Sequence, residues 1–98
     1  MILINDKLIT ATTASGTASD TFKIQGILRQ VFVKPTTATT QYDFKITNQH
    51  SLDVYEVESE TGVLSDEVAL PVRGTYSFTI ANATADEDFN IYLGTQNS

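Results

Sequence analysis

The sequence predicts an all-β protein, a single-domain antiparallel β-sandwich of about seven or eight strands with jelly-roll or immunoglobulin-like connections. Three observations lead to this prediction. β-branched and aromatic residues dominate, apolar and polar side chains alternate with a period of two, and turn signals recur about every ten residues. No segment keeps apolar residues at helical spacing over three turns. Without helices between the strands, neighbouring strands should pair antiparallel.

The first segments leave two alternatives open. Residues 1–9 are apolar and β-prone, so they form either the first strand of the sandwich or an arm that pairs with a neighbouring subunit. Residues 10–19 are rich in Thr, Ala and Ser, which is typical of a flexible linker or a long loop. The strand expected next, 20–25, is followed by Gly26, where a bend, a bulge or a tight turn is possible.

Segment 27–34 is apolar on both faces, which places it at the centre of the fold or in an interface. Simple alternation puts Val31 on one face, and Leu28 and Phe32 on the other. Pro35 ends this strand because proline lacks the N–H that a central ladder needs.

The second half of the chain contains the remaining strands. Tyr42, Phe44 and Ile46 alternate with polar residues and indicate a half-buried strand. The alternation then changes phase near Val54 and Tyr55, which indicates a bulge. Further strands are expected at residues 63–70, 75–80 and 89–93, with a turn or an irregular edge at 71–74.

Composition excludes several classes of function. The 98 residues suffice for one domain, 1–98. The six Lys and Arg residues are scattered and the net charge is -6, so we expect no nucleic acid and no membrane as partner. The absence of cysteine excludes disulfides, thiolate metal sites and a cysteine nucleophile. Residues 1–4 are too short an apolar run for a signal peptide or a membrane span, so a chain made in the cytoplasm is expected.

Chemical motifs are nearly absent, and we expect no enzyme, no cofactor and no small-molecule substrate. His50 lies beside Ser51, but no glycine pattern of a nucleophile elbow surrounds any serine, and a surface-turn histidine is favoured. Glu56, Glu58 and Glu60 are spaced to share one strand face. This row is either a Ca²⁺ site or a solvated face, and the solvated face is favoured, so no metal is predicted.

Two further polar features have plain interpretations. The acidic run 86–88 lacks the spacing of a calcium loop and is interpreted as a polar hairpin connection. Most aromatic residues are in phase with aliphatic neighbours and belong to the core, whereas three are candidates for an outward surface. Together with the N-terminal apolar residues, they form the predicted interface with another subunit or another protein: Met1, Ile2, Leu3, Ile4, Leu8, Phe32, Tyr55 and Tyr92.

Four segments resemble small structural proteins of tailed bacteriophages, across roughly residues 18–94. They are GILRQVFVKP at 26–35, YDFKIT at 42–47, VALPVRGTYSFTIANA at 68–83 and FNIYL at 89–93. The resemblance implies a capsid decoration, or cement, protein on the virion surface, assembled in the bacterial cytoplasm. It would bind the major capsid protein between capsomers as a homo-oligomer, a trimer or a dimer. The alternatives are a neck, tail or head-fibre subunit, or a non-catalytic protein- or carbohydrate-binding module.

Overall fold

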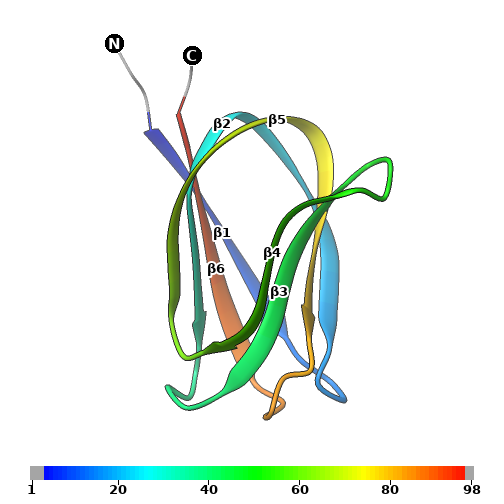
Figure 1. The fold of residues 1–98 in the computed structure, drawn as a ribbon, viewed down its shortest axis with the longest axis vertical. Helices are drawn as coiled ribbons and strands as arrows, with labels where there is room; N and C mark the ends of the chain where they lie inside the picture. Colours follow the sequence, from blue (N-terminus) through cyan, green and yellow to red (C-terminus); the bar gives the residue numbers. More distant parts are fainter. Residues whose placement is uncertain (1–3, 97–98) are drawn as a thin grey trace.

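The structure, a computed structural model, describes residues 4–96, which form a single antiparallel sheet and contain no helix (Figure 1). Accordingly, no helix in this range is long and apolar enough to cross a membrane. The sheet order is β1-β6-β2-β5-β3-β4. The six strands are β1 (Ile4–Thr12), β2 (Ala18–Pro35), β3 (Gln41–Asn48), β4 (Asp53–Thr61), β5 (Leu64–Ala81) and β6 (Asp88–Gln96). The all-β antiparallel prediction is confirmed, but six strands replace the seven or eight expected.

Two glycines explain the lower number of strands. β2 and β5 are each 18 residues long, and each runs through a glycine at which the sequence predicted a break. Gly26 has a φ of 121° and Gly74 a φ of 106°, yet the β2–β5 ladder continues past both. A Cβ on Gly26 would lie 2.8 Å from the Gln96 carbonyl oxygen, so only glycine fits there. These glycines bend the strands without ending them.

The bent strands carry the sheet around the core. In Figure 1, β2 and β5 arch across the top, and β3 and β4 lie in front of β1 and β6. Residues 27–35 of β2 pair with β6, whereas residues 76–81 of β5 pair with β3. The Tyr42 ring on β3 meets the Phe89 ring on β6 edge-on, with centroids 5.1 Å apart, although these strands share no ladder. The two ends of the sheet therefore pack against each other.

The core fills the space between these ends. Its fully buried side chains are Leu28, Val31, Val33, Tyr42, Phe44, Ile46, Phe78, Ile80, Phe89, Ile91 and Leu93. The Tyr42 hydroxyl is buried with them and donates a hydrogen bond to the Gly62 carbonyl oxygen at 2.7 Å. Burial strongly raises the pKa of this hydroxyl, so it remains a donor at any ordinary pH.

A bulge at Arg29 changes the faces predicted for β2. The register shifts between Leu28 and Gln30 against both neighbouring strands. As a result Leu28 and Val31 both point into the core, and the prediction that Leu28 shares a face with Phe32 is wrong. The prediction that this segment is central is confirmed, since β2 lies between β6 and β5 and ends at Pro35.

The first strand pairs within its own chain. β1 runs antiparallel to β6 from the Ile4–Gln96 pair to the Thr12–Asp88 pair, so residues 4–12 are an ordinary strand of this sheet and not a detached arm. Ser15 and Gly16 have positive φ and form a tight turn closed by the Ala14–Thr17 bridge. The linker expected at 10–19 is instead the end of β1, this turn and the start of β2.

Candidate binding surface

Three of the predicted interface residues meet on the outer face, defined as the side of β1, β6 and the second half of β2 that points away from the core. Leu8 is paired with Tyr92, and Tyr92 is paired with Phe32, so the three side chains form one line across the strands. The Phe32 and Tyr92 rings meet edge-on with centroids 5.5 Å apart. Leu8 is 57% exposed and Tyr92 37%, and Phe32 is half-buried. We call Leu8, Tyr92 and Phe32 the apolar row.

The position of the row follows from strand alternation. Ile91 and Leu93 flank Tyr92 on β6 and both point into the core. Val31 and Val33 flank Phe32 on β2 in the same way. Tyr92 and Phe32 must therefore point outward, because successive side chains of a strand alternate between faces, and Leu8 shares their face because it is paired with Tyr92.

A shallow depression of about 410 Å³ lies beside the row. The two rings border it, together with the polar side chains of Asp6, Gln30 and Lys34. Gly94 forms part of its lining, and a Cβ there would lie 3.4 Å from Asp6 Oδ1 and 3.5 Å from Gln30 Cβ. Gly94 itself is buried, and Asp6 and Gln30 are its nearest neighbours on this face. Exposed aromatic and aliphatic groups with mixed charges around them suit adhesion to another molecule.

The other predicted interface residues do not join this surface. Met1, Ile2 and Leu3 lie outside the described residues, and Ile4 is described only as the first residue of β1. Tyr55 is only partly exposed. Its ring lies edge-on to Phe44 with centroids 6.2 Å apart, and its hydroxyl donates to Asp66 Oδ2 at 2.9 Å.

The inward position of Tyr55 has a local cause. Ile46 pairs with Tyr55 while Thr47 pairs with Asp53, so Val54 is an extra residue in β4. The predicted bulge is therefore confirmed, and it brings Tyr55 opposite the buried Ile46, on the core side of the sheet. Burial, together with the Asp66 carboxylate, strongly raises the pKa of the Tyr55 hydroxyl.

The acidic residues of β4 do not form the uniform row that their spacing suggested. A second register shift, opposite Asp43, places Glu60 against the buried Tyr42, whereas Glu56 and Glu58 are exposed. The expected common face of Glu56, Glu58 and Glu60 is therefore wrong. Among residues 4–96, no three carboxylate or imidazole groups are placed to hold a metal ion.

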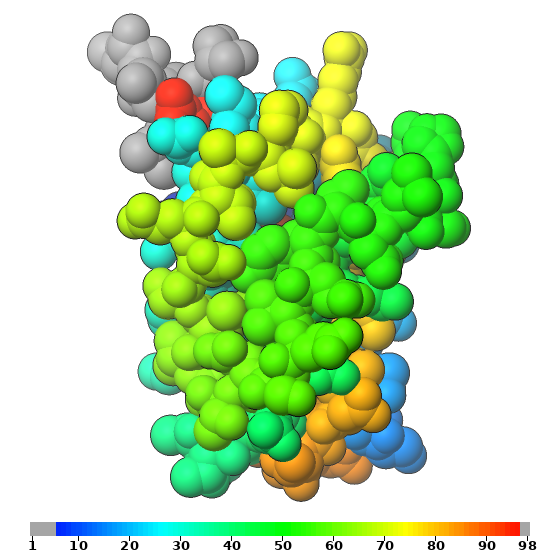
Figure 2. All heavy atoms as spheres, in the orientation of Figure 1, coloured from blue at the N-terminus to red at the C-terminus, as the bar shows by residue number. Residues whose placement is uncertain are grey.

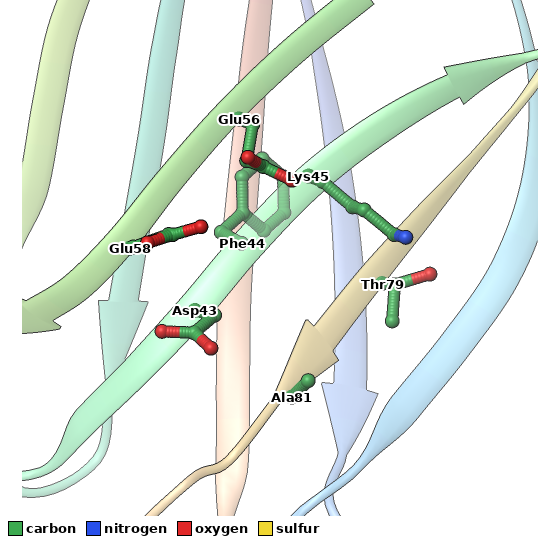
Figure 3. Close-up of a pocket in the computed structure, with 7 residues that line it drawn as sticks. All are labelled: Asp43, Phe44, Lys45, Glu56, Glu58, Thr79 and Ala81. Carbon is green, nitrogen blue, oxygen red and sulfur yellow. The ribbon is translucent and has the colours of Figure 1, made fainter. Parts of the chain in front are cut away.

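A small hollow of about 130 Å³ on this side is lined by residues of β3, β4 and β5 (Figure 3). Asp43 Oδ1 accepts the Ser59 N–H at 2.8 Å, and its Oδ2 accepts the Asn82 amide at 2.7 Å. These bonds lower the pKa of Asp43. Lys45 lies 3.9 Å from Asp53 Oδ1. The bonds of Asp43 fix the backbone bulge at Ser59, whose φ is 55°.

His50 lies in a turn that protrudes from the body of the protein (Figure 2). The Asn48 side chain accepts the His50 and Leu52 N–H groups at 2.9 and 3.0 Å and holds this turn. His50 and Ser51 are both exposed there, as predicted for a surface turn.

Sequence reasoning missed the role of the acidic run 86–88. Asp86 accepts the Gly16 N–H at 2.8 Å, Glu87 accepts the Thr37 N–H at 2.6 Å, and Asp88 accepts the Thr12 hydroxyl at 2.6 Å. Residues 82–88 lie beside the β1–β2 turn at the lower end of the molecule (Figures 1 and 2). We call this set of bonds the acidic latch.

The latch extends to buried threonines. Thr13 Oγ1 accepts the Glu87 N–H at 2.9 Å, and Thr40 Oγ1 donates to Glu87 Oε1 at 2.8 Å. Desolvation tends to raise the pKa of Glu87, but the hydrogen bonds from Thr37 and Thr40 outweigh it, so the pKa is lowered. The acidic latch therefore holds together the β1–β2 turn, the 36–40 connection and residues 82–88. The sequence indicated it only through many threonines and a run of three carboxylates.

Comparisons with known proteins indicate the fold alone. No family model and no curated protein matches the chain. A crystal structure of dimeric latent PorU from Porphyromonas gingivalis matches 97% of this chain with 11% identity and a TM-score of 0.54. A family two carbohydrate esterase from Cellvibrio japonicus matches 98% with 12% identity and a TM-score of 0.38. The chain spans only 13% and 35% of the lengths of these two proteins. The likeness to PorU shows that a β-arrangement of this kind recurs within a much larger protein.

Proposed function

We propose that this chain is a non-catalytic structural protein that binds a protein lattice through the apolar row. In the form that the bacteriophage resemblance suggests, it is a capsid decoration protein that binds the major capsid protein between capsomers. The observation that carries the proposal is the line of Leu8, Tyr92 and Phe32, exposed on a regular sheet face. Aromatic residues on rigid strands are typical anchors of protein interfaces because they lose little conformational entropy on binding.

In this proposal the protein acts by stabilising an assembled lattice, without any chemical reaction. A protein that binds the assembled lattice and not its separated subunits lowers the free energy of the assembled state by mass action. Several weak contacts suffice when one oligomer engages several lattice subunits at once. We also propose that the bent sheet acts as a two-layer sandwich. The Tyr42–Phe89 contact between β3 and β6 and the Tyr55–Asp66 bond between β4 and the first half of β5 support this arrangement. Such a scaffold holds the outer face rigid.

A second candidate is carbohydrate recognition on the same surface. Asp6, Gln30 and Lys34 supply hydrogen-bonding groups beside the exposed Tyr92 ring. An aromatic face with polar neighbours is the usual composition of a sugar-binding site. The shallow shape of the depression and the edge-on packing of Phe32 against Tyr92 favour a protein partner.

The test is co-sedimentation with capsid shells that lack the chain, assembled from the major capsid protein of the same genome. We expect the wild-type protein to bind, and the double substitution Leu8→Ala and Tyr92→Ala to weaken binding about ten-fold or more. Leu52→Ala is the matched control, since Leu52 is 63% exposed in the distant 48–52 turn. Full binding by a folded double variant would refute the proposed contact. Binding of wild type to polysaccharide but not to shells would favour the second candidate.

A further inference from the structure

We propose that β1 is the edge through which two copies of this chain pair, antiparallel and centred on Leu8. Among the strands of residues 4–96, the sheet order leaves one side of β1 without a neighbour. The inference concerns the chain itself and does not rest on the proposed capsid role.

The open side of β1 presents the backbone groups of its even-numbered residues. The Thr13 N–H donates to the Glu87 carbonyl at 3.0 Å, which continues the β1–β6 ladder at a hydrogen-bonded pair. In an antiparallel ladder such pairs alternate with pairs whose N–H and C=O groups point away. Odd-numbered residues of β1 therefore bond to β6. The N–H and C=O groups of Asp6, Leu8 and Thr10 point to the open side.

The edge of β4 is protected against pairing, whereas β1 is not. β4 carries exposed Glu56 and Glu58, and bulges at Val54 and Ser59 interrupt its regular spacing. Carboxylates and bulges are the usual means by which native edges avoid adding strands. β1 has no register shift, glycine or proline over nine residues.

Two further half-strands have an unpaired side, and both are blocked. The first half of β2 pairs only with β5, and the Asp20 carboxylate accepts the Thr21 N–H there at 2.8 Å. The first half of β5 pairs only with β2, and Pro71 and the Tyr55–Asp66 bond restrict access to it. No described side chain bonds to the backbone of β1 on its open side. Among the residues described, β1 is therefore the edge best suited to receive a strand.

The occupant that fits this edge is a second copy of β1. Its charges, Asp6 and Lys7, cancel, although the whole chain has a net charge of -6. Pairing that is centred on Leu8 aligns the full length Ile4–Thr12 with itself and places Asp6 opposite Thr10 of the partner subunit. Centring on Lys7 would oppose two lysines, and centring on Asp6 would oppose two carboxylates, which is unfavourable. The two-fold relation also closes the assembly, whereas β1 on β4 would give an open filament.

Pairing at Leu8 also explains its exposure. Leu8 ends the apolar row at the edge of the sheet and is 57% exposed. In the dimer it meets Leu8 of the partner subunit, and the row continues unbroken across both copies. The dimer thus doubles the length of the apolar row on one continuous outer face.

Sedimentation velocity over a range of concentrations, with amide exchange followed by NMR, tests the proposal. We expect a species of twice 10.7 kDa for wild type. The substitution Leu8→Lys should raise the dimer dissociation constant about ten-fold or more, because it opposes two ammonium groups and removes the apolar contact. Ser65→Lys is the control. Ser65 is exposed on β5, where it is paired with Phe32, so the substitution makes the same charge change away from β1 and should leave the dimer dissociation constant unchanged.

Amide exchange identifies the edge and the register. On dimerisation the amides of Asp6, Leu8 and Thr10 should gain protection, whereas those of Lys7 and Ile9 are already protected by β6. A dimer that stacks through the outer face would leave the Leu8 amide unprotected and would overturn the proposal. A wild-type chain that stays monomeric throughout, or equal effects of Leu8→Lys and Ser65→Lys, would overturn it as well.

Discussion

The acidic latch makes a quantitative prediction through Glu87. The Glu87 carboxylate accepts the Thr37 N–H at 2.6 Å and the hydroxyl of the buried Thr40 at 2.8 Å, so it joins the 36–40 connection to the start of β6. The substitution Glu87→Gln preserves the size of the side chain and removes its charge. The amide can still accept from Thr37 and donate to Thr40, but both bonds become neutral.

The expected loss follows from the strength of these bonds. Hydrogen bonds to a charged group stabilise by about 1.5–3 kcal/mol, and neutral ones by about half as much. Because Glu87 is partly exposed, we expect Glu87→Gln to lower the free energy of unfolding by about 1 kcal/mol. In a domain of this size that corresponds to a fall in Tm of about 4–8 °C.

The loss should depend on pH in a definite direction. The pKa of Glu87 in the folded protein lies below its usual value of 4.5. Its contribution to stability is therefore fully present above about pH 4.5 and is lost as the pH falls through the lower, folded pKa. We expect the difference between wild type and Glu87→Gln to be largest near pH 7 and to shrink toward pH 3.

Urea denaturation at pH 7 and pH 3 measures both effects. Glu58→Gln is the control, because Glu58 is exposed on β4 and the substitution makes the same change in net charge. The reasoning is refuted if Glu87→Gln and Glu58→Gln have equal stability at pH 7. It is also refuted if the deficit of Glu87→Gln grows as the pH falls.

Three further predictions concern the fold. Tyr42→Phe should lower the free energy of unfolding, measured by urea denaturation, by about 1–1.5 kcal/mol, because it removes the hydroxyl that donates to the buried Gly62 carbonyl. Unchanged stability would contradict this hydrogen bond. Gly26→Ala should lower the free energy of unfolding by about 2 kcal/mol or more, because alanine is strained at a φ of 121° and its Cβ would clash with the Gln96 carbonyl. Gly94→Ala is the control and should change the free energy of unfolding by less than about 0.5 kcal/mol. Equal changes in Tm for the two variants would contradict this explanation. Asp43→Asn should speed amide hydrogen exchange at Ser59 about ten-fold, because it weakens the charge-assisted hydrogen bond from the Ser59 N–H to the Asp43 carboxylate. The amide of Phe78 is the internal reference. Unchanged exchange at Ser59 would show that the bulge does not depend on Asp43.

Regular alternation made the strand cores predictable. Tyr42, Phe44 and Ile46 are all buried, and each polar neighbour between them lies on the other face, as the period of two requires. The same logic placed Tyr92 outward between Ile91 and Leu93. It could therefore be predicted from the sequence that part of the apolar row is exposed.

Features that depend on distant parts of the chain were not predictable. Gly26 serves equally in a turn or in a bent strand, and the choice is made by pairing with β5 and by the approach of Gln96. The bulge at Val54 could be predicted from the sequence, but the side to which the Tyr55 side chain points depends on the exact register of β4 against Ile46. Thr13 acquires its role only from Glu87, which follows it by 74 positions. Local patterns contain no information on such partners.

The pairing of β1 with β6 has a consequence for synthesis of the protein. Of the strands described, β1 leaves the ribosome first and its ladder partner β6 leaves last, so the Ile4–Gln96 pair can form only after residue 96 has been synthesised. Contacts that join the two ends of a chain form slowly because a large loop must close first. During this delay both sides of β1 are available to other chains, and slow translation or a crowded cell would favour aggregation that starts at β1.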